Sequence, residues 1–117
     1  MVEQVDPLNE DPLDITTGLW FAGAYQVWRT LSKEQQALTD PDFAAQAAIG
    51  ETLDANALHQ LNQRRGLLGS HLRQFMQRFD LILTPSTAVP AFKALPAGHS
   101  AMNSEAMLGW TPFSYPF

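Results

Sequence analysis

Residues 54–79 read DANALHQLNQRRGLLGSHLRQFMQRF, and they form the longest periodic stretch of this 117-residue chain. Seven positions follow one another at alternating spacings of three and four residues, and all but one are apolar: Leu58, Leu61, Arg65, Leu68, Leu72, Phe75 and Phe79. Such a spacing places the side chains on one face of an α-helix. We therefore predict a long amphipathic helix, in which Gly66 and Gly69 either mark a close approach by another backbone or are simply tolerated.

Two further helices are expected upstream of this stretch. Asp40-Pro41 is a favourable helix start, because Asp40 can cap the helix and Pro41 loses no hydrogen bond at the first helical position. Gly50 is expected to end that helix in a left-handed conformation. An earlier helix is expected to start at Thr16 or Thr17. Its buried face would carry Trp20, Ala24, Val27 or Trp28, and Leu31.

Two short segments have the composition of β-strands. Residues 80–84 read DLILT, and a continuous apolar run ended by Pro85 is typical of a strand buried on both faces. Residues 2–5 alternate apolar and polar side chains and predict a weaker N-terminal strand. We therefore predict an α/β fold that is mostly helical in this chain, with these two strands. Beyond Pro85 the chain is expected to be extended and irregular, with one helical turn near residues 104–108.

Two features predict that residues 1–117 form a single incomplete domain. A buried strand needs neighbours on both sides, because unpaired backbone N–H and C=O groups are costly to bury, and the chain offers too few strands to supply them. The last eight residues, 110–117, are rich in aromatic side chains and lack a polar tail. Such a run is expected to continue into the structure against which it packs.

The composition excludes several classes of protein. A net charge of −5, with Lys33 and Lys93 as the only lysines, argues against a nucleic-acid surface, which needs clustered basic residues. No apolar stretch approaches the roughly 20 residues that span a bilayer, and the acidic N-terminus lacks the pattern of a signal peptide. The chain has no cysteine, so disulfides and thiolate chemistry are not expected. We expect no nucleic-acid or membrane partner and a cytoplasmic location.

Residue types suited to catalysis occur without a recognisable catalytic spacing. His59 and His71 lie about 120° apart around the predicted helix, so the two cannot hold one metal ion. Ser32-Lys33 and Ser70-His71 are sequence neighbours, and adjacent side chains on a helix do not face each other. We therefore expect no catalytic residue, no metal site and no cofactor site within this chain.

Several motifs, taken in order, resemble the C-terminal part of the amidase signature family. They are residues 2–7 (VEQVDP), 19–24 (LWFAGA), 80–85 (DLILTP), 88–92 (AVPAF) and 110–117 (WTPFSYPF). Each motif alone is unspecific, but together they cover nearly the whole chain. The resemblance implies an α/β fold around a large mixed sheet, and hydrolysis of the C–N bond of a carboxamide.

The resemblance also implies a Ser–cis-Ser–Lys triad and a glycine-rich oxyanion loop, without a metal or organic cofactor. The Gly/Ser-rich stretch and the catalytic lysine of the family have no counterpart here, because neither Lys33 nor Lys93 matches that position. The catalytic residues are thus expected outside this chain, and the isolated chain is expected to be inactive. The same resemblance places Trp110, Thr111 and Phe113 near the catalytic centre, where they would help to shape the substrate pocket.

Two other interpretations remain open. The chain could be a non-catalytic helical interaction module of amidase ancestry, forming a homodimer through the Leu/Phe stripe of residues 58–79 or through an exposed sheet edge. It could also be half of a split enzyme whose catalytic half is another chain. The expected partner is accordingly the remainder of the amidase or a second copy of this chain.

Overall fold

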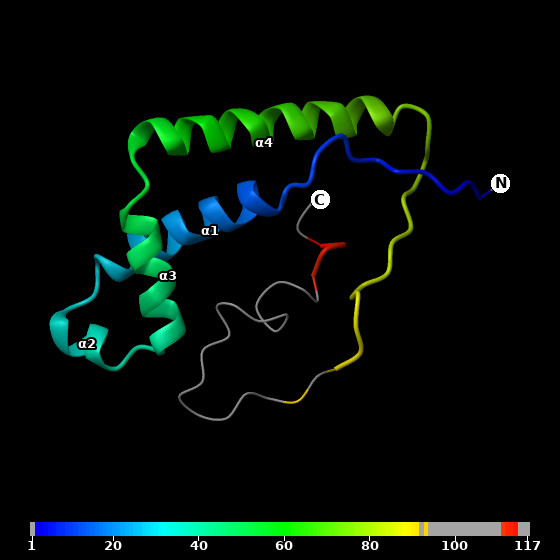
Figure 1. Ribbon diagram of the computed structural model, residues 1–117. Helices are drawn as coiled ribbons and strands as arrows, with labels where there is room; N and C mark the ends of the chain where they lie inside the picture. Colours follow the sequence, from blue (N-terminus) through cyan, green and yellow to red (C-terminus); the bar gives the residue numbers. More distant parts are fainter. Residues whose placement is uncertain (1, 92, 94–110, 115–117) are drawn as a thin grey trace.

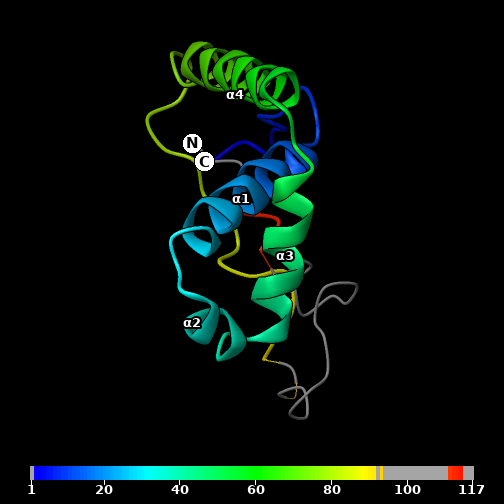
Figure 2. The same ribbon diagram turned by 90° about the vertical axis from the view of Figure 1, so that its left-hand side faces the viewer.

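The computed structural model describes residues 2–91, 93 and 111–114, and this part of the chain is mostly helical. Its helices are α1 (Leu13–Trp28), α2 (Lys33–Ala37), α3 (Pro41–Glu51) and α4 (Ala55–Phe75). α1 is the central element, because both α3 and α4 pack against it (Figure 1). Figure 2 shows the same order from the side, with α4 over α1 and α3 crossing α1 toward α2.

α4 is the long helix that the sequence predicts, although it ends at Phe75 and not near Phe79. It begins after Asp54, whose side chain accepts a hydrogen bond from the Ala57 N–H at 2.7 Å. α1 covers part of the apolar stripe, and Leu68 is buried within it.

α1 and α3 pack through small residues. Gly50 lies within α3, and a Cβ at this position would overlap the Phe21 carbonyl oxygen of α1. Ala22, Ala24 and Ala47 are also buried. The prediction that Gly50 ends its helix is therefore wrong, because the helix continues through it and the glycine serves the contact with α1. The predicted start of α3 is confirmed, since the Asp40 side chain accepts a hydrogen bond from the Asp42 N–H.

The close backbone approach considered for Gly66 and Gly69 of α4 is not observed, and two expectations about α1 need correction. Nothing stands within 4 Å of where a Cβ would be at Gly66, and the nearest atom to one at Gly69 is a side-chain nitrogen of Arg73, so no backbone approaches α4 there. α1 begins at Leu13, before the predicted threonines. Its expected buried face is partly uncovered, because Trp20 is 63% exposed.

The two predicted β-strands are also wrong. In the described part of the chain, residues 2–5 and 80–84 are extended, but neither takes part in a ladder. Leu81 and Leu83 are 79% and 83% exposed, which is the opposite of a strand buried on both faces. An extended segment becomes a strand only when a neighbour accepts and donates its backbone hydrogen bonds, and in the described part of the chain no backbone hydrogen bond joins either segment to a neighbour. The structure is therefore helical and not α/β.

The molecule is elongated and thinly packed. Its radius of gyration is 17.2 Å and its extents are 56 × 38 × 19 Å, whereas a compact domain of this length has a radius of about 13 Å. Its accessible surface is 8693 Å², against about 6300 Å² for a folded monomer of this mass. The buried apolar residues in the described part are few: Ile15, Ala22, Ala24, Ala47 and Leu68.

Candidate functional site

A groove of about 570 Å³ lies between two extended segments, residues 2–7 and 78–84. The two segments come from opposite ends of the helical region and run past each other near the end of α4 (Figure 1). Its apolar lining consists of Val2, Val5, Pro7, Phe79, Leu81, Ile82 and Leu83. Three charged residues, Glu3, Arg78 and Asp80, also line it. The groove thus offers an apolar strip with charges beside it, and no pair of groups set for proton transfer.

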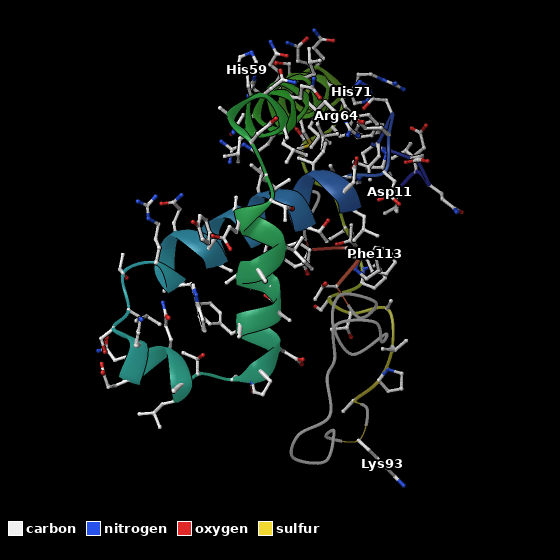
Figure 3. All side chains as sticks on the ribbon, turned by 60° about the vertical axis from the view of Figure 1, so that its left-hand side comes forward. Asp11, His59, Arg64, His71, Lys93 and Phe113 are labelled. Atoms are coloured by element: carbon white, nitrogen blue, oxygen red, sulfur yellow. The ribbon has the colours of Figure 1, made fainter. Side chains whose placement is uncertain are left out.

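A cluster of charged side chains fixes the segment that leads into this groove. Arg64 of α4 donates to Oε2 of Glu10 through Nη2 at 2.7 Å and through Nε at 3.3 Å. The same guanidinium donates to Asp14 in the first turn of α1, through Nη1 at 2.5 Å and Nη2 at 3.2 Å. In Figure 3, Arg64 lies on the side of α4 that faces Asp11 and the start of α1.

The contact between Arg64 and Asp14 favours the ionised forms of these two side chains. The hydrogen bond from Arg64 lowers the pKa of the Asp14 carboxyl below its ordinary value, with the Ile15 backbone N–H acting in the same direction. The two carboxylates raise the pKa of the Arg64 guanidinium, with Asp14 as the larger cause. The side chains are partly exposed, at 39% for Arg64, 31% for Glu10 and 61% for Asp14. The cluster is therefore an open ionic contact and not a buried one.

Two of the predicted pocket residues, Thr111 and Phe113, fall outside this groove. Trp110 lies outside the described residues. Thr111 and Phe113 belong to a turn in which the Ser114 N–H donates to the Thr111 carbonyl at 2.9 Å. Phe113 is 36% exposed. Neither residue lines the groove between residues 2–7 and 78–84, so their proposed role at a substrate pocket stays a prediction.

The serine hydroxyls with described partners serve helix structure. The Ser32 hydroxyl accepts from the Gln35 N–H and donates to Glu34, as part of a capping box at the start of α2. The Glu34 backbone N–H, as the first cause, and the Ser32 hydroxyl lower the pKa of the Glu34 carboxyl. The Ser70 hydroxyl donates to the Gly66 carbonyl one turn earlier, at 2.9 Å. The Ser70 hydroxyl is not directed at a base, and the acceptor of the Ser32 hydroxyl is the exposed Glu34 carboxylate of its own helix turn.

Among the described residues, His59, His71 and Lys93 do not converge either. Figure 3 shows His59 and His71 at separate positions along α4, while Lys93 lies at the far end of the extended segment. No group of three or more histidine, aspartate or glutamate side chains among the described residues is placed to hold a metal ion. None of the described helices is long and apolar enough to cross a membrane.

Comparison with known proteins gives no relative: no family model, no curated protein and no solved structure matches this chain. The site is therefore described by its own geometry. Sequence reasoning missed the contact of Arg64 with Glu10 and Asp14, because Arg64 lies beside the apolar stripe and its partners are 54 and 50 residues away. The sequence does show an arginine flanking an otherwise apolar stripe, but this pattern does not indicate which residues the arginine contacts.

Proposed function

We propose that this chain is a non-catalytic part of an amidase-like hydrolase that acts on carboxamide C–N bonds. The Ser–cis-Ser–Lys residues that carry the reaction lie on polypeptide outside this chain. The support for this assignment is the ordered set of motifs at residues 2–7, 19–24, 80–85, 88–92 and 110–117, together with a cytoplasmic composition free of cysteine.

The exposure of the leucines at residues 81 and 83 is the observation that favours a missing partner surface. Burying a leucine side chain is worth about 1.5–3 kcal/mol, so leaving Leu81 and Leu83 both in water forgoes a substantial part of a domain's stability. They lie next to the groove that also contains Val2 and Phe79. Contiguous exposed apolar side chains of this kind mark an interaction surface. We assign this surface to contact with the catalytic part of the enzyme.

The chemistry within the described chain agrees with a non-catalytic role. A serine nucleophile needs an effective base within hydrogen-bond reach. The Ser70 hydroxyl donates to a backbone carbonyl, and the Ser32 hydroxyl donates to the Glu34 carboxylate, whose lowered pKa makes it a weak base. The expected experiment is an assay of the purified chain with a simple aryl amide, in which turnover equals that of the buffer. Turnover that a single Ser→Ala change abolishes would overturn the proposal.

A helical interaction module is the second candidate, and the character of α1 favours it. α1 carries one charged residue, Asp14, and three of its large apolar side chains are exposed: Leu13, Trp20 and Val27, at 39%, 63% and 53%. Residues seven apart lie on one face of a helix, so these three form an exposed apolar stripe, and such a stripe is normally covered by a partner. Sedimentation of the isolated chain discriminates between the candidates. A defined homodimer with cooperative unfolding supports the module, whereas ill-defined aggregation supports a part separated from its enzyme.

A further inference from the structure

The groove has one wall whose position depends on few contacts. Residues 2–9 make no hydrogen bond to another element among the described residues; the Leu8 N–H bonds to the nearby Asp6 side chain. Among the described residues, the first side chain of this segment that makes a polar contact with a helix is Glu10, which binds Arg64 of α4. Packing at Val5, Pro7 and Leu8 is partial, since each is only half-buried.

The contact of Arg64 with Glu10 and Asp14 joins three elements at one point. Glu10 belongs to the N-terminal segment, Asp14 to the first turn of α1, and Arg64 to the middle of α4. The guanidinium has a rigid planar fork of donors, so it can hold two carboxylates in a fixed direction where an ammonium could not. Asp14 also lies at the positive end of α1, which holds its carboxylate in place independently of Arg64.

We propose that Arg64 is a positioning residue that acts as an ionic latch, holding residues 2–10 beside α4 and thereby keeping the groove against residues 78–84 formed. When the latch is released, the N-terminal segment moves away from α4 and the groove widens. This proposal rests on the proposed function at one point: the proposed function gives the groove its role as a contact surface. The latch itself is a property of the isolated chain.

Raising the ionic strength should release this latch. The three side chains are partly exposed, so salt screens their attraction strongly, with a Debye length of about 10 Å at 0.1 M and about 3 Å at 1 M. The groove is therefore expected to be formed at low salt and loosened at high salt. Apolar contacts in the groove would respond in the opposite direction, because excluded salts strengthen them.

Paired spin labels across the groove test the latch directly. The chain has no cysteine, so Gln4→Cys and Thr84→Cys, both exposed and both in the groove lining, introduce the only two thiols. Double electron–electron resonance then reports the distance between the two segments. A narrow distribution is expected at low salt, and 1 M KCl is expected to broaden it and shift it to longer distances.

Variants then separate the latch from general destabilisation. Arg64→Gln and Glu10→Gln should each reproduce the high-salt distribution at low salt and remove the response to KCl. Arg65→Gln is the matched control, because it removes an exposed arginine at the next position of the same helix and should leave the distribution unchanged. Asp14→Asn should have the smaller effect, since Asp14 is not in the N-terminal segment.

The result that overturns the proposal is equally specific. If Arg64→Gln and Glu10→Gln give the same distribution as Arg65→Gln, Arg64 does not set the groove. Should Arg64→Gln lose helical circular dichroism, Glu10→Gln decides alone, because it removes the tie while the Arg64–Asp14 contact remains. No catalytic partner or amide substrate enters this experiment, so its outcome is independent of whether the proposed function is correct.

Discussion

At the residue scale, the contact between α1 and α3 depends on the missing side chain of Gly50. A methyl group there would overlap the Phe21 carbonyl and approach the Tyr25 Cβ to 3.0 Å. The obstacle is backbone, which cannot swing aside as a flexible side chain can. By contrast, Gly18 faces the Leu61 side chain, which has other rotamers available. The packing of α1 against α3 therefore tolerates a side chain at position 50 less well than the packing of α1 against α4 tolerates one at position 18.

We predict that Gly50→Ala destabilises the chain by about 2–3 kcal/mol, because overpacking forces the two helices apart. Gly23→Ala is the matched control: it lies in α1 with open space around its Cα, and replacing a helical glycine by alanine should stabilise by about 0.5–1 kcal/mol. Urea unfolding followed by circular dichroism measures both changes. Equal effects of the two substitutions would show that α1 and α3 do not meet at Gly50.

Because Asp14 is paired with Arg64, we predict that part of the free energy of unfolding is lost at acidic pH. The pKa of Asp14 is lowered in the folded chain, so its contribution is fully present above the ordinary pKa of 3.8 and is lost as the pH falls through the folded value. Because both side chains are largely exposed, the contribution is small. Asp14→Asn should reduce the slope of stability against pH below pH 4. An unchanged slope in Asp14→Asn would contradict the contact.

At the scale of elements, the sequence predicts helices well where the signals are local. The Asp40-Pro41 start is visible in neighbouring residues, and it is observed. The cap of Asp54 is an equally local signal, although it is not among the predictions. The start of α1 was predicted too late because the relevant signal is Asp11, whose carboxylate accepts from the Leu13 N–H. The capping box at Ser32 and Gln35, which starts the short α2, was also overlooked.

The extended segments could not be predicted correctly from residue types alone. DLILT has the composition of a buried strand, but a strand is a pairing between segments, and its partner is not encoded in its own composition. Residues 80–84 therefore retain an extended backbone and lose the burial that the apolar pattern implied. The candidate groove has the same origin. Residues 2–7 and 78–84 pass each other without forming a ladder, and the groove lies between them.

The cap of α4 gives a prediction for an element. Asp54→Ala removes the acceptor of the Ala57 N–H and should cost about 1 kcal/mol, since one orphan donor at the helix start is left without its partner. Asp54→Asn is the control, because asparagine caps a helix about as well. Hydrogen exchange of the first-turn amides of α4 should quicken in Asp54→Ala only. Faster exchange in both variants would mean that the carboxylate charge, and not the cap, holds the turn.

At the scale of the whole molecule, the chain has more surface than its mass requires. The excess over a typical folded monomer is on the order of 2000 Å², and exposed apolar residues occur on α1, on α4 and in the extended segments. The net charge of −5 opposes unspecific association of identical chains but does not cover these residues. We propose that another polypeptide covers these exposed apolar residues.

Reconstitution with a separately expressed Gly/Ser-rich catalytic region of an amidase signature enzyme tests this central claim most directly. Hydrolysis of an aryl amide should be absent from the chain alone and should rise when the two are mixed. Leu81→Ser with Leu83→Ser should abolish the rise, whereas Leu38→Ser, at an 87% exposed position beside α2, should leave it intact. Hydrolysis that is equal with and without the chain, or restored equally well by the double leucine variant, would contradict the account.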